Sequence, residues 1–116
     1  MTMEKDMFSL KGKVALVTGA SGAIGRDISM ALAGAGADVI IVGRNADRLR
    51  ETAKMVEETG RSSHAIMADL SKSEDVERII RESMDRFQCV DILVNNAATN
   101  VFNKAEKFTG DRKSVV

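Results

Sequence analysis

The sequence predicts an α/β domain in which a parallel sheet lies between layers of helices. Three observations predict it: four short apolar segments recur at regular spacing, amphipathic segments lie between them, and a polar segment follows each apolar one. Strands that alternate with helices pair in parallel through right-handed crossovers, which places helices on both faces of the sheet. A chain of 116 residues forms one domain. We therefore expect a three-layer fold with about four strands.

The first predicted strand, Val14–Val17, is a short apolar run typical of a strand buried on both faces. It leads into Thr18–Gly25, a segment with three glycines, and then into a predicted helix. Five residues mark the inward face of that helix: Ile24, Ile28, Ala31, Leu32 and Ala35. Backbone N–H groups at the start of such a helix suit a phosphate or pyrophosphate, because the helix dipole is positive there. A tight turn without a ligand is the alternative.

The second and third predicted strands are Val39–Val42 and Ala65–Met67. The helix between them begins after Asn45, a good N-cap residue. It ends at Gly60, which suits a left-handed C-terminal position. Its inward face is predicted to carry Ala46, Leu49, Ala53 and Val56.

The helix after the third strand is predicted to start at a capping box formed by Ser71 and Glu74. Its inward residues are Val76, Ile79, Ile80, Met84 and Phe87. The fourth strand, Ile92–Val94, follows. We expect the first two helices to cover one face of the sheet and the third helix alone to cover the other. With the fourth strand as an open apolar edge, the chain is expected to be marginally stable or to self-associate through that edge.

Polar segments follow each of the four predicted strands. They are the glycine segment, Gly43–Asn45, Asp69–Ser71 and Asn95–Ala98. The carboxyl ends of parallel strands lie at one edge of the sheet, and ligands of open α/β sheets bind there, where the strand order reverses. Four chemically distinctive segments at one edge favour a dinucleotide as the ligand.

Composition excludes several other functions. Seventeen basic residues balance seventeen acidic ones, so the chain has no charge pattern for nucleic acid or for an anionic membrane. No apolar run reaches membrane-spanning length, and the charged N-terminus is unlike a signal peptide. The single Cys89 cannot form an internal disulfide, which fits a reducing compartment. We expect a soluble, cytoplasmic protein with no metal site.

Three segments resemble the short-chain dehydrogenase/reductase family: Thr18–Gly25, Asp69–Leu70 and Val90–Ala98. The resemblance covers residues 10 to 105 and implies a single Rossmann-like domain that interconverts alcohols and ketones with NAD(H) or NADP(H). It divides the chain into an N-terminal extension (1–10), a partial cofactor-binding domain (11–105) and an atypical tail (106–116). One departure is Ala23, where the family usually has glycine, although Gly22 adds a glycine beside it.

The resemblance also implies roles for individual residues. The cofactor pyrophosphate would lie against Gly19, Ala20, Ser21, Gly22 and Ile24. Asp69 would accept a hydrogen bond from the adenine amine, with the Leu70 backbone beside it. Asn96 and Ala97 would line the nicotinamide ribose, and Asn95 would brace the sheet. Purely structural roles stay open for four of them: a helix cap for Asp69, an N-cap for Ser21, and turn positions for Asn95 and Asn96.

Arg44 indicates which of the two cofactors binds. A site specific for NAD places Asp or Glu after the second strand, about 20 residues beyond the glycines, to bind the ribose 2′-hydroxyl. Here Arg44 holds that position with the uncharged Asn45 after it, and Asp38 lies at the opposite end of the strand. Because a guanidinium binds a 2′-phosphate bidentately, we expect NADP(H) in preference to NAD(H). The alternative is that Arg44 is a solvated loop residue or stacks on adenine.

The chemistry of the family depends on residues that this chain lacks. In the family a Tyr acts as general acid/base, a Lys one helical turn later stabilises its phenolate, and a Ser orients the carbonyl. The sequence has no Tyr, and neither His64 nor Cys89 falls at the predicted ligand edge. We predict no catalytic residue: the chain is expected to be the cofactor-binding portion of an oxidoreductase, inactive by itself, with a reading frame cut short at the tail. A non-catalytic dinucleotide-binding or protein-interaction module and a scaffold fragment without a ligand are the alternatives.

Overall fold

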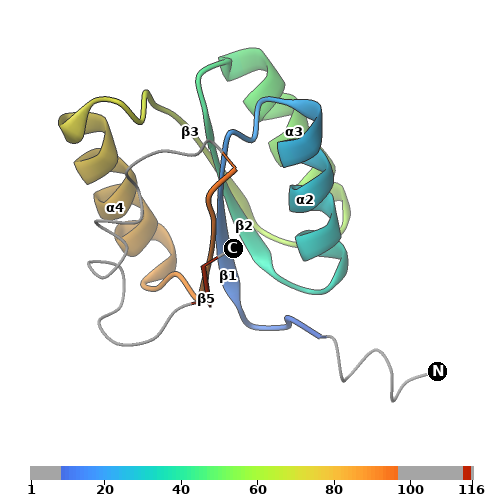
Figure 1. The fold of residues 1–116 in the computed structure, drawn as a ribbon. Helices are drawn as coiled ribbons and strands as arrows, with labels where there is room; N and C mark the ends of the chain where they lie inside the picture. Colours follow the sequence, from blue (N-terminus) through green and yellow to red (C-terminus); the bar gives the residue numbers. More distant parts are fainter. Residues whose placement is uncertain (1–8, 97–113, 116) are drawn as a thin grey trace.

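A computed structural model describes residues 9–96 and 114–115 of the chain. The elements in chain order are β1 (Val14–Thr18), α2 (Ala23–Gly34), β2 (Asp38–Gly43), α3 (Ala46–Glu58), β3 (Ser63–Met67), α4 (Ser73–Phe87), β4 (Ile92–Val94) and β5 (Ser114–Val115) (Figure 1). The predicted alternation of strands and helices is confirmed. None of the helices in this described part is long and apolar enough to cross a membrane.

The strands form one parallel sheet in the order β3-β2-β1-β4-β5. Leu16 in β1 is paired with Ile40 in β2 and with Leu93 in β4, which fixes the register at the centre of the sheet. The chain builds outward from β1 to β3 and then returns to the other side of β1. The strand order therefore reverses between β1 and β4, where open α/β sheets bind their ligands.

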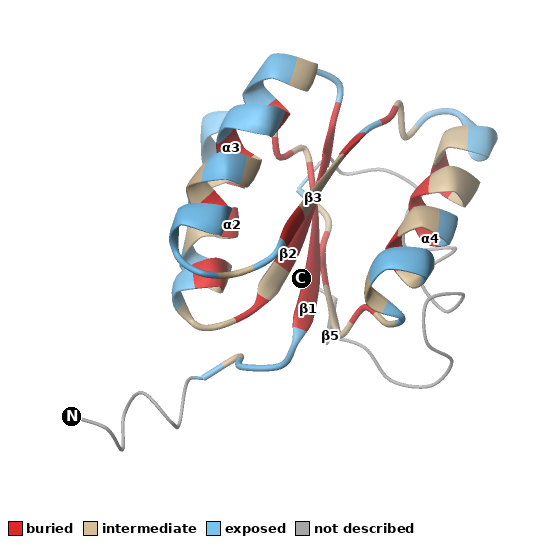
Figure 2. Ribbon diagram, turned by 180° about the vertical axis from the view of Figure 1, so that it is seen from behind, coloured by how far each residue is buried: buried red, intermediate tan, exposed pale blue. Residues whose placement is uncertain are grey.

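Helices cover both faces of the sheet, as the sequence predicts. Helices α2 and α3 lie on one face and α4 on the other (Figures 1 and 2). Successive side chains of a strand point to opposite faces, so β2 supplies both cores. The α4 layer contains Leu16, Ile40, Val42, Ile66, Val76, Ile79 and Ile80 among its buried residues. The α2–α3 layer contains Val17, Val39, Ile41, Ala33, Leu49 and Val56.

Most helix boundaries follow their predicted signals. The Asn45 side chain accepts a hydrogen bond from the Arg48 N–H at 3.0 Å and so caps α3. Gly60 adopts the left-handed conformation just after α3, with φ of +90°. The capping box at the start of α4 is wrong. The N-cap is Lys72, without a side-chain hydrogen bond, because the Ser71 hydroxyl donates to Asp69 Oδ1 at 2.7 Å instead.

The predicted inward face of α2 is partly wrong. Ile28 and Leu32 pack in the α2–α3 layer, but Ile24 is 68% exposed and Ala31 is exposed as well. The residues that α2 buries are small: Gly25, Ser29 and Ala33. At Gly25 even a Cβ would collide with the Gly19 carbonyl oxygen, in the turn that follows β1. The apolar pattern alone therefore predicted the wrong set of buried residues on α2.

The fourth strand is not an open edge. β5 pairs with it in parallel, with Ser114 opposite Ile92 and Val115 opposite Leu93. This ladder satisfies backbone groups of β4 that would otherwise form an unpaired edge. The predicted open edge of strand four is therefore wrong, while self-association of the chain stays a prediction.

Candidate functional site

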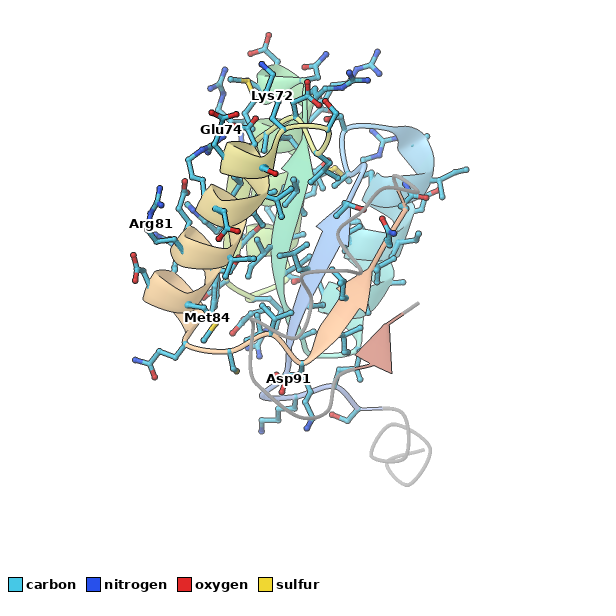
Figure 3. All side chains as sticks on the ribbon, turned by 60° about the vertical axis from the view of Figure 1, so that its left-hand side comes forward. Lys72, Glu74, Arg81, Met84 and Asp91 are labelled. Carbon is cyan, nitrogen blue, oxygen red and sulfur yellow. The ribbon has the colours of Figure 1, made fainter. Side chains whose placement is uncertain are left out.

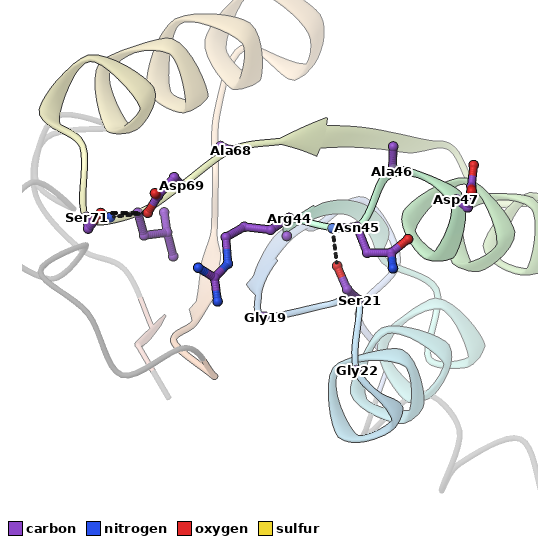
Figure 4. A pocket seen from close by; sticks show the side chains of 12 residues that line it. Gly19, Ser21, Gly22, Arg44, Asn45, Ala46, Asp47, Ala68, Asp69 and Ser71 are labelled. Carbon is purple, nitrogen blue, oxygen red and sulfur yellow. Dashed lines mark hydrogen bonds between the residues drawn. The ribbon is translucent and has the colours of Figure 1, made fainter.

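A cavity of about 840 Å³ opens at the carboxyl ends of β1, β2 and β3 (Figure 4). Its lining comes from three chain segments that each follow a strand: Gly19, Ser21, Gly22, Gly43, Arg44, Asn45, Ala46, Asp47, Ala68, Asp69, Leu70 and Ser71. This volume is in the range that holds a small organic ligand or much of a cofactor. Three of the four predicted polar segments thus form one concave surface.

The first wall is the glycine turn at the start of α2. Gly22 is the N-cap in an extended conformation, and no side chain caps the helix. The first backbone hydrogen bond of the helix runs from the Arg26 N–H to the Gly22 carbonyl at 3.0 Å, so the amides before Arg26 precede the intrahelical pattern. Free amides at the positive end of a helix dipole are a binding site for phosphate groups.

The glycines set the shape of this wall. A Cβ on Gly25 would collide with the Gly19 carbonyl oxygen and would lie 2.6 Å from Ala20 Cα. A Cβ on Gly22, by contrast, would lie 3.9 Å from its nearest neighbour, the Gly19 oxygen, so the surface in front of the helix is open. The turn is tightly packed at Gly25 and open at Gly22. A backbone that a phosphate group approaches closely needs such an open side.

Hydrogen bonds hold the turn to the neighbouring strands. The Ala20 N–H donates to the Val42 carbonyl at 2.9 Å, and the Asn45 N–H donates to Ser21 Oγ at 3.2 Å. On the other side, Asn96 Nδ2 donates to the Gly19 carbonyl at 3.2 Å. The position of the turn is therefore set by backbone and short side chains of the rim, which is a preorganised arrangement.

Arg44 follows β2 and is exposed at the rim. Its side chain reaches over the cavity, between Gly19 and the segment of Asp69 and Ser71 (Figure 4). Within residues 9–96, no hydrogen bond or ion pair engages its guanidinium group. The adjacent Gly43 is needed for the approach of the two loops, since a Cβ there would collide with Ser21 Oγ. A cationic fork with free donors faces the cavity.

Asp69 forms the opposite wall together with Leu70. Its Oδ1 accepts hydrogen bonds from the Ser71 hydroxyl at 2.7 Å and from the Ser71 N–H at 3.0 Å. These two bonds lower the pKa of Asp69 below its usual value of 3.8, and the charges of Lys72 and Arg44 act in the same direction. The carboxylate is thus ionised at neutral pH and is an acceptor at the cavity. It does not cap α4, because the N-cap is Lys72.

The structure brings together six of the predicted site residues: Gly19, Ser21, Gly22, Arg44, Asp69 and Leu70. Ala20 is fully buried, and Ile24 is exposed without lining the cavity. Asn96 contacts the turn without lining the cavity, while Asn95 Oδ1 accepts a hydrogen bond from the Thr18 hydroxyl and links the ends of β1 and β4. The predicted Ala97 lies outside the described residues.

Ala46, Asp47 and Ala68 also line the cavity and were not among the predicted residues. Ala46 and Asp47 are the first two residues of α3. The Asn45 cap signal could have found them, because it places the start of a second helix at the same rim. Ala68 has no chemical signal of its own.

His64 and Cys89 lie away from the cavity. His64 Nε2 is 2.9 Å from Glu82 Oε1, on the α4 side of β3. Burial, and then the neighbouring Asp91 carboxylate, raise the pKa of the Cys89 thiol, so it is a poor nucleophile at neutral pH. Over the described ranges, no three His, Cys, Asp or Glu residues are grouped as a metal site would require.

A parallel α/β sheet with a glycine turn at the carboxyl end of its first strand defines a nucleotide-binding fold of the Rossmann type. Comparison with protein families narrows this class. The family model for short chain dehydrogenases matches residues 13–114, and the chain belongs to that family.

Its relatives are longer proteins with several activities. The chain is 47% identical over 103 residues to the 2-dehydro-3-deoxy-D-gluconate 5-dehydrogenase of Bacillus subtilis, an alignment that covers 89% of this chain and 40% of that protein. It spans about two fifths of the length of the curated relatives that it matches.

Among solved structures, L-sorbose reductase from Gluconobacter frateurii, complexed with NADPH and L-sorbose, superposes with a TM-score of 0.75 at 36% identity. That match covers 79% of this chain and 35% of the reductase. An NAD⁺-bound xylitol dehydrogenase superposes with a TM-score of 0.71 at 30% identity, covering 72% and 32% of the two chains. Relatives of similar likeness thus hold either cofactor.

Proposed function

We propose that this chain is the NADP(H)-binding portion of an oxidoreductase that transfers hydride between alcohols and ketones. The observation that carries the proposal is the single cavity that joins an uncapped helix start, a free guanidinium and an ionised carboxylate. The amides at the start of α2 would hold the pyrophosphate, Arg44 the 2′-phosphate, and Asp69 the adenine amine. The bound nicotinamide would supply or accept the hydride.

The preference for NADP(H) rests on Arg44, since the relatives include both cofactor types. A carboxylate at this place would accept a hydrogen bond from a 2′-hydroxyl and repel a 2′-phosphate. The guanidinium does the reverse, and its planar donors match a phosphate group. A cytoplasmic location remains a prediction that goes with this function.

We further propose that the 116-residue chain binds the cofactor without turning over a substrate. The sequence has no Tyr, and the described residues place neither His64 nor Cys89 near the cavity. Cofactor binding without catalysis is thus the second candidate function, and the lack of Tyr and the positions of His64 and Cys89 support it. Incubation of the chain with NADPH and a panel of ketones tests it: oxidation of NADPH above the rate without protein would contradict it.

A titration tests the cofactor proposal. NADPH and NADH fluorescence should change saturably on binding, and Arg44→Glu should weaken NADPH by roughly 10- to 100-fold, because it replaces a charged hydrogen-bond donor by a like charge to the phosphate. NADH affinity should change much less. The control is Arg81→Glu, an equal charge change on the outer side of α4, which points away from the sheet (Figure 3).

Three results would contradict the proposal at different points. Absence of saturable binding by either nucleotide would contradict the proposed binding function. Equal losses of affinity for NADPH and NADH in Arg44→Glu would contradict the proposed contact of Arg44 with the 2′-phosphate. Equal losses in the Arg44 and Arg81 variants would mean that only net charge matters.

A further inference from the structure

The segment between β3 and α4 forms one wall of the cavity, and it has few backbone bonds of its own. Ala68, Asp69, Leu70 and Ser71 all line the cavity. The Ala68 N–H donates to the Gly43 carbonyl at 2.9 Å, which continues the pairing of β3 with β2 for one residue. Beyond it, the wall leaves the sheet, and its next backbone bond, from the Lys72 N–H to the Asp69 carbonyl at 3.0 Å, is local and does not join it to another element.

Asp75, in the first turn of α4, provides that support. Its Oδ2 accepts a hydrogen bond from the Asp69 N–H at 2.7 Å. The bond joins the backbone of the wall to a helix that is anchored in the core by Val76 and Ile79. The Asp75 carboxylate does not itself line the cavity.

Arg78, one turn further along α4, completes the contact. Its Nη2 donates to the Met67 carbonyl, the last residue of β3, at 2.7 Å and lies 3.7 Å from Asp75 Oδ1. Its Nη1 donates to Glu82 Oε2 at 3.2 Å. The Arg78 and Asp75 side chains are 34% and 24% exposed, so water competes less with these bonds than at an open surface. The Arg78 guanidinium thus links the end of β3 to the Asp75 carboxylate, which accepts the hydrogen bond from the Asp69 N–H.

We propose that Asp75 and Arg78 are positioning residues that set the Asp69–Leu70 wall for the adenine half of the dinucleotide. The inference rests on the proposed function and extends it to residues that touch no cofactor. The pyrophosphate side of the cavity is held separately, by the bonds of Ala20 and Asn45 described above. Loss of Asp75 should therefore affect one half of the ligand and spare the other.

The experiment measures the affinity of the full chain for two probes, 2′,5′-ADP for the adenine half and inorganic pyrophosphate for the glycine turn. Asp75→Ala should weaken 2′,5′-ADP about fivefold, the effect of one lost hydrogen bond, and leave pyrophosphate unchanged. Glu74→Ala is the matched control, because it removes the same charge from the same helical turn at an exposed side chain (Figure 3).

A second variant keeps the test valid if Asp75→Ala does not fold. Arg78→Lys retains the charge but loses the planar fork that bridges Met67 and Asp75, and it should weaken 2′,5′-ADP about two- to threefold. Wild-type affinity of a folded Asp75→Ala or Arg78→Lys variant for 2′,5′-ADP would overturn the inference, even if its melting temperature falls. Equal losses in Asp75→Ala and Glu74→Ala would also overturn it, in favour of a long-range charge effect. If the wild-type chain binds neither probe, it is the proposed function that has failed.

Discussion

Gly25 sets how closely α2 approaches the turn that follows β1. It is buried, and a Cβ at its position would meet the backbone of Gly19 and Ala20 rather than a side chain that could rotate away. The same contact keeps the glycine turn tight beneath the front of the helix. A side chain at Gly25 would therefore displace the amides that are proposed to bind the pyrophosphate.

Gly25→Ala is expected to destabilise the chain by about 1–3 kcal/mol, because the extra methyl overpacks a backbone contact that cannot relax. It should also weaken pyrophosphate binding. The matched control is Gly34→Ala, in the same helix, where a Cβ has open space and no positive φ. That variant should be stabilised by up to about 1 kcal/mol, since alanine is the better helix former. Thermal melts measure both changes, and equal stability of Gly25→Ala and wild type would contradict the prediction.

The positions of the site residues could be predicted from the sequence where they depend on local geometry. The glycine turn, Arg44 and Asp69 follow strands directly, and parallel strands place their ends together, so their convergence in one cavity needed no further information. Ile24 shows the opposite case. Its apolar side chain fits an amphipathic pattern, but the packing distance between α2 and β1 decides which line of the helix is buried, and that distance is a tertiary property.

At the scale of elements, α4 is attached to β3 by a row of polar contacts outside the apolar core. Glu82 in α4 accepts a hydrogen bond from Arg78, and its Oε1 lies 2.9 Å from Nε2 of His64 in β3. Burial raises the pKa of Glu82, but the hydrogen bonds with His64 and Arg78 outweigh it, and the pKa falls below the ordinary value of 4.5. A folded-state pKa below the unfolded one means that the ionised carboxylate stabilises the fold.

Glu82→Gln is expected to lower the melting temperature at pH 7. The contribution of the ionised Glu82 is fully present above pH 4.5 and is lost as the pH falls through the lower folded-state pKa. The difference between variant and wild type should therefore shrink below that pH and vanish once both carry a neutral side chain. Melts between neutral and acidic pH measure this, with Glu58→Gln on the exposed end of α3 as control. A difference that stays constant with pH would show that the carboxylate charge is unimportant.

The ends of elements were less predictable than their existence. Asn45 caps α3 as its pattern predicts, since its side-chain oxygen accepts a hydrogen bond from the Arg48 N–H of the same helix. Ser71 has an equally good pattern, but the Asp69 carboxylate two residues earlier takes its hydroxyl and its N–H. β5 has no strong local signal, since two residues acquire their strand geometry only from pairing with β4.

At the scale of the molecule, one sheet separates two apolar layers, and the cavity draws its walls from both. The glycine turn and the start of α3 belong to the side of α2 and α3, whereas the Asp69–Leu70 wall is held from α4. Leu70 packs against the α4 layer. The cavity is therefore complete only when both layers are folded, so its stability depends on how strongly the sheet couples them.

Ile40→Ala and Ile41→Ala test this coupling. The two residues are neighbours in β2 and fully buried, yet Ile40 belongs to the α4 layer and Ile41 to the α2–α3 layer. Each truncation should lower the free energy of unfolding by about 2–5 kcal/mol, and each variant should still unfold in a single transition because the layers share the sheet.

Urea unfolding followed by circular dichroism and by labelling of Cys89 measures the transition, because Cys89 packs against the α4 layer alone. The two signals should coincide in both variants. If Ile41→Ala loses helix at urea concentrations where Cys89 is still protected, the layers unfold independently. The wall formed by Asp69 and Leu70 would then persist without the glycine turn opposite it, and nucleotide binding would be lost before the α4 layer unfolds.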